Sequence, residues 1–402
     1  MKVFKPSKLS VLTRCFEHEQ RFFMGVSVLA FIPLAAAPGL LPEAAMWTFA
    51  GQRLGKDGAL DAGMPKTRGE YLIHGSAYAP GGVAVTSCPV GARVGPLSKR
   101  LSVIGDRYWT SGRASQPQPF TAMPLTWQHA YGGPDFLRNP IGKGYGESEY
   151  HGQRVQLLPN VEHAEALVGS PRDRPEPGGF GALDISWPQR SALAGTYDQH
   201  WLDNLFPGLA RDVDWGIFNL ATGDQQLHDP SWEGGESYEF MNLHPEQPRL
   251  VGELPRWLGR TFVTRKLIPR EPASKPTERF EEVPLRLQTL WFFPDAERAV
   301  LIFQRSLAIA SEDGTDIEHL LIGADTAEAP RPAEHYAEVL AARLDPESGG
   351  FAALDDAPLL PEGLADVRDP ALAAAEALNT REGLMEANLQ KRRTKEFQQA
   401  RA

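Results

Sequence analysis

The chain of 402 residues contains 42% hydrophobic and 23% charged residues, a balance typical of a folded protein that is long enough to bury a substantial core. Its formal net charge is −10, and residues 312–369 alone hold fifteen acidic against three basic residues, so the sequence lacks the clustered positive charge of a nucleic-acid-binding protein. The two cysteines, Cys15 and Cys88, form no Cys-x-x-Cys pair, which fits a reducing cytoplasm, and the 38 glycines and 34 prolines indicate a β-rich fold with many turns.

The first long apolar segment, Phe22–Leu41, predicts a buried β-strand. Its twenty residues match the length of a membrane-spanning helix. However, Pro33 and Pro38 interrupt it, and the interior of a helix tolerates proline only at a cost of about 3 kcal/mol. Residues Gly25–Ile32 form a short apolar run that contains several β-branched side chains. We therefore expect a strand there and no interaction with a membrane.

Short strands are expected to follow between residues 70 and 109. Apolar runs at Glu70–Tyr78, Val83–Ser87 and Lys99–Trp109 are separated by glycine, proline and aspartate, which is the signature of an all-β protein. The last run is expected to contain two strands, one on either side of the Gly105-Asp106 pair.

The stretch Ala130–Glu147, AYGGPDFLRNPIGKGYGE, raises the question of a nucleotide site, because a lysine stands between two glycines. A P-loop requires Ser or Thr after its Gly-Lys pair, and here a glycine follows Lys143. A dinucleotide loop must open a helix, and the sequence continues with Tyr-Gly instead. We interpret the stretch as a rigid structural loop with several glycines at positive φ. Its key residues are Tyr131, Gly132, Gly133, Asn139, Pro140, Gly142 and Gly144.

The middle of the chain, Gly152–Asn242, is rich in loops, and long irregular stretches in a compact domain are usually functional. Its tryptophans allow two interpretations. They attach the loops to the sheets, or they contact another protein, because aromatic residues and arginine are enriched at the centres of interfaces. Under the second interpretation, the candidate partner-binding residues in the segments Ser170–Arg190 and Thr196–Gln226 are Trp187, Arg190, Tyr197, Trp201, Arg211 and Trp215.

The clearest unit is an antiparallel β-hairpin at Pro284–Ala310. Two runs of apolar residues flank the turn Pro294–Glu297, in which proline fixes φ and aspartate can bond its own backbone. A further strand is predicted at Arg260–Ile268. The segment Pro269–Glu282, rich in proline, lysine and glutamate, is expected to be a linker between that strand and the hairpin.

The chain changes character after residue 310. The acidic stretch Glu312–Asp369 predicts a solvated, partly flexible segment, with a short helix at Pro332–Leu344. The residues Ala371–Ala402 are strong helix formers and predict a helical tail. We therefore expect a β-rich domain at 1–310, an acidic segment at 311–370 and a helical tail at 371–402. The expected fold class is mainly β, with antiparallel, sandwich-like sheets, long irregular loops and a helical C-terminal region.

No arrangement of residues in the sequence predicts a catalytic or metal site. Ser27 lacks the second glycine of a nucleophile elbow, and no acidic partner can be assigned to His74. Zinc or iron requires three or more converging ligands, whereas the chain offers only pairs that are close in sequence. These pairs are His200 with Asp203, His228 with Asp229, and Asp212 with Asp214. We therefore predict no catalytic residue, no metal and no cofactor.

Four stretches in a fixed order resemble a known bacterial family. They are AYGGPDFLRNPIGKGYGE, LLPNVEHAEALVGSPRDRPEPGGFGALDISWPQR, GTYDQHWLDNLFPGLARDVDWGIFNLATGDQQ and LHPEQPRLVGELP. The N-terminal VLTRCFEHEQRFFMGVSVLAFIPL and the motif GDRYW are also similar. The family consists of domains of unknown function linked to type VI secretion, some of them fused to pentapeptide repeats that this chain lacks. The resemblance extends from about Lys2 to Ala310.

The resemblance implies protein binding, and it offers no catalytic residue to carry over. Family members look like adaptors or chaperones that hold a toxic effector, often one with a PAAR-type tip domain, and help to load it onto the VgrG spike. The implied protein is cytoplasmic and non-catalytic, with an effector and the VgrG spike as partners and with no nucleic acid or membrane partner. Two alternatives stay open: a metal- or carboxylate-dependent hydrolase, and a structural component of the secretion apparatus.

Overall fold

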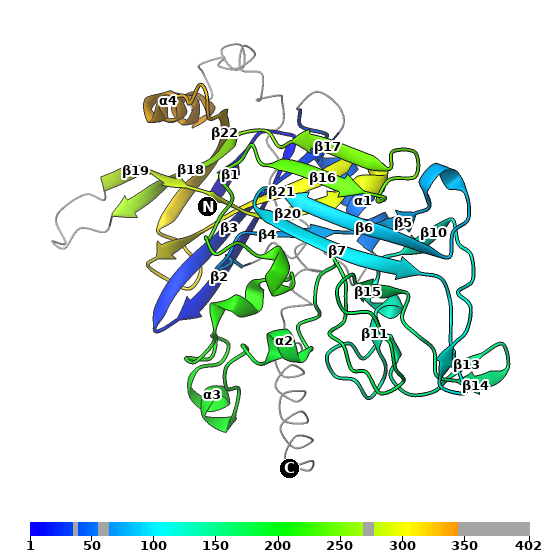
Figure 1. Cartoon of the computed structure of the whole chain (residues 1–402). Coiled ribbons are helices and arrows are strands. Elements are labelled where there is room, and N and C mark those ends of the chain that lie inside the picture. Colours follow the sequence, from blue (N-terminus) through cyan, green and yellow to red (C-terminus); the bar gives the residue numbers. More distant parts are fainter. Residues whose placement is uncertain (35–38, 55–63, 268–276, 345–402) are drawn as a thin grey trace.

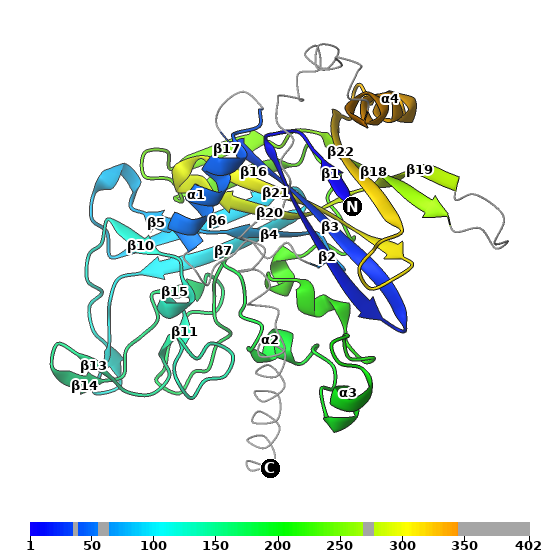
Figure 2. The same ribbon diagram turned by 180° about the vertical axis from the view of Figure 1, so that it is seen from behind.

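The computed structural model describes residues 1–34, 39–54, 64–267 and 277–344, and within them the protein is mainly β, with several mostly antiparallel sheets. Figures 1 and 2 show the larger sheets in the upper part of the molecule and a layer of loops and short helices beneath them. The predicted helical tail at 371–402, and the acidic segment from residue 345 onward, lie outside the described residues. The predicted division into domains stays a prediction.

A five-stranded sheet in the order β2-β3-β21-β20-β4 forms the centre of the fold. Its neighbouring strands are antiparallel, except that β4 runs parallel to β20. Two predictions are confirmed here: the strand at Gly25–Ile32 lies within β3, and β20 and β21 form the predicted hairpin. The elements are β2 (Leu9–His18), β3 (Arg21–Pro33), β4 (Glu70–Ile73), β20 (Arg286–Phe293), the turn η5 (Pro294–Ala296) and β21 (Arg298–Ile309).

A second five-stranded sheet, entirely antiparallel, has the order β15-β7-β6-β16-β17. The two sheets share one hydrophobic core, in which the ring of Phe292 lies 5.8 Å from that of Tyr238 and 5.0 Å from that of Phe240. The predicted strand at Val83–Ser87 is wrong, because the regular strand begins only at its last residue. The strands are β6 (Ser87–Val94), β7 (Leu97–Ile104), β15 (Val161–His163), β16 (Ser237–Met241) and β17 (Arg249–Glu253).

Burial on both faces explains the long apolar run of β3. Val26 and Val28 face the core shared with the second sheet, whereas Leu29 and Phe31 belong to a cluster on the other face that helix α1 (Glu43–Leu54) covers. A strand that is buried on both faces reads as a continuous hydrophobic run. None of the helices in the described ranges is long and apolar enough to span a bilayer.

A four-stranded sheet has the order β1-β22-β18-β19, and the remaining strands of the described residues form two-stranded sheets. Its strands are β1 (Lys2–Phe4), β18 (Trp257–Leu267), β19 (Thr277–Pro284) and β22 (Ile317–Thr326). β1 is parallel to β22, and the other pairs are antiparallel. The predicted strand at Arg260–Ile268 is confirmed as far as Leu267. The linker expected at Pro269–Glu282 is wrong from residue 277 onward, because β19 pairs there with β18.

Strand β22 lies in the stretch that was expected to be solvated and flexible, and this expectation is wrong for residues 317–326. The strand lies between β1 and β18, and the side chain of Asp325 is almost fully buried. Its carboxylate accepts hydrogen bonds from Arg260 (2.9 Å) and Arg331 (2.6 Å). It also accepts one from Tyr336 (2.7 Å) of helix α4 (Ala333–Leu344), which confirms the predicted short helix. The negative charge of Asp325 is therefore compensated inside the fold.

Most of the remaining short elements belong to the connections around the second sheet and to the loop layer. Of the two strands expected around Gly105-Asp106, β7 confirms the first, whereas the second is wrong up to residue 108, because β8 begins only at Trp109. The short elements are β5 (Ser76–Tyr78), η1 (Pro80–Gly82), β8 (Trp109–Thr110), β9 (Arg113–Ala114), β10 (Ala122–Pro124), η2 (Trp127–His129), β11 (Tyr131–Gly132), β12 (Lys143–Gly144), β13 (Ser148–Tyr150), β14 (Gln153–Val155), α2 (Pro188–Ser191), α3 (Gln199–Asn204), η3 (Trp215–Phe218) and η4 (Gly223–Gln225).

Candidate functional site

The loop layer contains a small unit with a hydrophobic core of its own, residues 191–218, which we call the α3 lobe. Trp201 lies in this core, where its ring is 4.8 Å from that of Tyr197 and its indole N–H donates to the carbonyl of Gly208 (2.9 Å). The lobe packs against the β2–β3 hairpin through Phe16, whose ring lies 5.7 Å from that of Trp215. The lobe is therefore a packed structure on a rigid support.

The structure places the six candidate partner-binding residues in different environments. Arg211 is exposed and Trp215 is half-buried. The other four side chains are almost entirely buried, with exposed fractions of 5% for Trp187, 6% for Arg190, 7% for Tyr197 and 3% for Trp201. A buried side chain shapes the loops and does not itself contact a partner in this conformation. Of the six candidates, only Arg211 and Trp215 are therefore exposed enough to contact a partner directly. The partner-binding role of the whole set stays a prediction.

Arg190 joins two parts of the loop layer. Its Nε donates to the carbonyl of Ile217 (2.8 Å), and its Nη1 donates to the carbonyl of Leu183 (2.8 Å). Helix α2 is thereby connected both to η3 in the α3 lobe and to the segment that precedes α2. The ring of Trp187, in the same turn, lies 5.5 Å from that of Trp127 in η2. These contacts hold helix α2 against η2, against η3 and against the segment that precedes α2.

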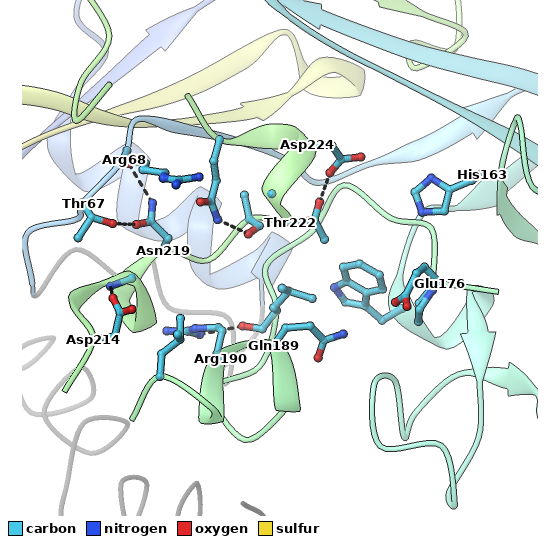
Figure 3. A pocket seen from close by; sticks show the side chains of 18 residues that line it. Thr67, Arg68, His163, Glu176, Gln189, Arg190, Asp214, Asn219, Thr222 and Asp224 are labelled. Carbon is cyan, nitrogen blue, oxygen red and sulfur yellow. Dashed lines mark hydrogen bonds between the residues drawn. The ribbon is translucent and has the colours of Figure 1, made fainter. Parts of the chain in front are cut away.

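A cavity of about 580 Å³ lies between the start of β4, α2, η3 and η4. Figure 3 shows Thr67, Arg68 and Asn219 gathered on one side of it, with His163 and Glu176 on the other. Its size is within the range of pockets that bind small ligands. Apolar side chains contribute to its walls, among them Trp127, Leu183 and Leu193, and its ionisable side chains are Arg68, His163, Glu176, Arg190, Asp214 and Asp224.

One wall of the cavity is supported by a buried ion pair. Lys66 Nζ lies 2.5 Å from Glu70 Oε1, and the side chains are 1% and 0% exposed. The other oxygen of Glu70 accepts hydrogen bonds from the backbone N–H groups of Leu220 (2.8 Å) and Ala221 (3.0 Å) and from the amide of Asn219 (3.2 Å). Glu70 therefore connects the first residue of β4 to the segment 219–221 beside the cavity.

A buried lysine supports the wall formed by η4. Lys99 Nζ, on β7, donates to Thr222 Oγ1 (2.8 Å), Asp224 Oδ1 (3.0 Å) and Gln225 Oε1 (2.8 Å). Burial lowers the pKa of Lys99 to about 8, although the nearby Asp224 carboxylate opposes the shift. Burial, and after it the charge of Lys99, also lower the pKa of the cavity-lining His163.

Lys99 gives the stability of the protein a pH dependence of defined sign. Between the folded pKa of about 8 and the ordinary value of 10.5, the unfolded state binds more protons, so stability rises with pH. We expect the free energy of unfolding of the wild type, relative to that of Lys99→Met, to increase by about 2 kcal/mol from pH 8 to pH 10. Urea denaturation at several pH values measures this difference, and a difference that stays flat or falls would contradict the assignment.

The glycine-rich stretch Ala130–Glu147 is a compact loop closed by parallel pairing of β11 with β12. Asn139 is completely buried, and its amide donates to the carbonyls of Trp127 (2.8 Å) and Tyr131 (3.1 Å). Gly144 has φ +111°, as the interpretation as a structural loop requires. The amide side chain of Asn139 therefore occupies the centre of this loop.

Gly132 is the position in this loop where a side chain is least tolerated. A Cβ atom there would lie 2.1 Å from the carbonyl oxygen of Asn139, so the backbone would have to shift. We expect Gly132→Ala to lower the free energy of unfolding by about 1–3 kcal/mol in chemical denaturation. Gly51→Ala in α1 is the matched control, since its Cβ meets nothing within 4 Å and alanine favours a helix. Equal stability of the two variants would refute the close approach.

The His and carboxylate pairs noted in the sequence belong largely to the local structure of the α3 lobe. The hydrogen bonds are Asn204 with His200 Nδ1 (3.1 Å), Gln199 to Asp203 (2.8 Å), Thr196 Oγ1 to Asp212 (2.8 Å) and Gly216 N to Asp214 (2.8 Å). Within residues 1–34, 39–54, 64–267 and 277–344, no three His, Cys, Asp or Glu side chains converge closely enough to hold a metal ion.

Comparison with known proteins gives one match. The model of a protein family described as "Uncharacterized protein conserved in bacteria (DUF2169)" matches residues 19–304. No curated protein and no solved structure matches the chain. The matched region contains the α3 lobe and every residue that lines the cavity, and it ends within β21.

Proposed function

The chain belongs to this family of uncharacterized proteins conserved in bacteria (DUF2169), and on that premise we propose that it is a non-catalytic cytoplasmic adaptor that binds a type VI secretion effector and assists its loading onto the VgrG spike and its PAAR tip. The residue motifs that resemble type VI effector adaptors lead to this function. They include most of the α3 lobe and most of the cavity lining, whereas Thr67 and Arg68 lie outside them.

The observation that carries the proposal is that the α3 lobe has a hydrophobic core of its own and that buried hydrogen bonds connect the walls of the cavity. An adaptor must recognise another polypeptide, and a preformed surface loses less conformational entropy when it binds. Arg211 and Trp215 belong to the residue types that dominate binding energy at interfaces. Phe206, 46% exposed, adds an apolar side chain to the same lobe. The core shared by the two five-stranded sheets supports the sandwich-like scaffold expected beneath this surface.

Affinity capture from the native host, followed by mass spectrometry, tests this function. We expect the wild-type protein to recover a larger effector, and the double variant Arg211→Ala/Trp215→Ala, once circular dichroism has shown that it is folded, to recover much less of it. Arg113→Ala is the control, because this exposed arginine lies in β9, outside the α3 lobe. Recovery of no effector would refute the adaptor function. Full recovery by the folded double variant would show that the effector binds elsewhere.

A further inference from the structure

The cavity contains an arginine, Arg68, whose charge is not paired within the described parts of the protein. Arg68 is exposed and lines the cavity. Its guanidinium makes no hydrogen bond or ion pair with any residue of the ranges that the structure describes. Arginine is always charged and carries five N–H donors in a planar fork, which matches both oxygens of a carboxylate. Arg68 is therefore available to an anionic group that enters the cavity.

Other charged groups around the cavity already have partners. Glu176 is paired with Arg138, and Asp224 accepts a hydrogen bond from Lys99 (3.0 Å). Arg190 is almost buried, and its guanidinium donates to backbone carbonyls of the loop layer. These groups therefore already take part in interactions within the protein. The guanidinium of Arg68 takes part in none within the described residues.

The backbone that carries Arg68 is held in place. The side chain of Asn219 donates through Nδ2 to the backbone carbonyl of Arg68 (2.9 Å). The other atom of the same side-chain amide, Oδ1, accepts a hydrogen bond from Thr67 Oγ1 (2.9 Å). Two residues earlier, the side chain of Gln288 bonds both the N–H (2.9 Å) and the carbonyl (2.6 Å) of Lys66. The guanidinium therefore extends from a fixed point, which reduces the entropy lost when it binds a ligand.

We propose that the cavity receives an extended segment of the protein partner and that Arg68 binds a carboxylate side chain of that segment. The inference rests on the adaptor function proposed above. Apolar residues next to the carboxylate would lie against Trp127 and Leu193 on the cavity wall. Asp214 also lines the cavity, and its Oδ1 accepts a hydrogen bond from the backbone N–H of Gly216. Its second carboxylate oxygen can accept a hydrogen bond from a peptide N–H of the bound segment.

A pair of short peptides that differ in one charge tests this preference for a carboxylate. The probes are an acetylated and amidated Leu-Glu-Leu peptide and its Leu-Gln-Leu counterpart, titrated against the full chain by ligand-observed NMR. We expect the Glu peptide to bind the wild type at least about tenfold more tightly than the Gln peptide, because a charge-assisted hydrogen bond contributes about 1.5–3 kcal/mol. This preference should disappear in Arg68→Ala, persist in part in Arg68→Lys and remain complete in Arg113→Ala.

Equal binding of the two peptides to the wild type, or an unchanged preference in Arg68→Ala, would overturn the inference. Affinity capture with the same variants separates this failure from failure of the adaptor function. The role of Arg68 would be refuted, and the adaptor function would remain, if Arg68→Ala recovers as much effector as the wild type and the wild type does not prefer the Glu peptide. A preference for the Glu peptide that depends on Arg68, with no effector recovered, would support the carboxylate site and refute the adaptor function.

Discussion

Replacing Glu70 by alanine is expected to lower the free energy of unfolding by about 3–5 kcal/mol, because removal of one partner leaves the other charge buried and unpaired. Lys66 would lose its carboxylate in an environment where its side chain is 1% exposed. The backbone N–H groups of Leu220 and Ala221 would lose their acceptor at the same time. Urea denaturation monitored by tryptophan fluorescence measures the change.

The double variant Lys66→Met/Glu70→Gln separates the charge from the hydrogen bonds. It removes both charges and retains an oxygen that can accept from the two backbone N–H groups, so it is expected to recover more than half of the stability lost in Glu70→Ala. A loss below about 1 kcal/mol in Glu70→Ala, the size of a surface ion pair, would show that the pair is not buried as described.

Trp201→Ala is expected to remove about 3–5 kcal/mol from the stability of the α3 lobe, as is usual when a large buried aromatic side chain is truncated. Trp201 is 3% exposed, and it supplies both the aromatic contact with Tyr197 and the hydrogen bond to Gly208. Because the lobe has a core separate from that of the sheets, we expect local opening of residues 191–218. Amide hydrogen exchange followed by mass spectrometry reports protection in each segment.

Trp215→Ala serves as the comparison, since the same residue type is only half-buried there. It should reduce protection in the lobe much less than Trp201→Ala. Protection of 191–218 that is unchanged in Trp201→Ala would contradict the existence of a separate core. Simultaneous loss of protection in β20 and β21 would also contradict it, because the lobe and the central sheet would then unfold as one unit.

The parts of the fold that local patterns predict are those whose partners are close in sequence or whose composition is unambiguous. The hairpin of β20 and β21 has its turn signal between two apolar runs, and the apolar residues of β3 are buried on both faces. Strand β22 was not predicted, because its acidic residues suggested a solvated segment. Asp325 has its partner Arg260 sixty-five positions away, and no local pattern reveals a pair at that distance.

The candidate site shows the same limit. Residue type drew attention to tryptophan and arginine in the loops, but type alone does not distinguish a side chain inside a loop core, such as Trp201, from one at its surface, such as Arg211. Sequence reasoning did not single out Lys99, Glu70 or Arg68. For Glu70 the available signal was its place at the start of the otherwise apolar strand β4, whereas Lys99 stands beside Arg100 in a strand of mixed polarity and had no such signal. No local signal marked Arg68, because the cavity beside it is formed by segments that lie far apart in the chain.

We propose that the β scaffold binds another polypeptide through the α3 lobe and the cavity. The most direct measurement is a titration of the purified effector, identified by affinity capture, into the full chain by isothermal calorimetry. We expect saturable binding at a fixed stoichiometry, weakened at least about tenfold by Arg211→Ala/Trp215→Ala and unchanged by Arg113→Ala. Absence of saturable binding, or binding that the double variant leaves intact, would contradict it.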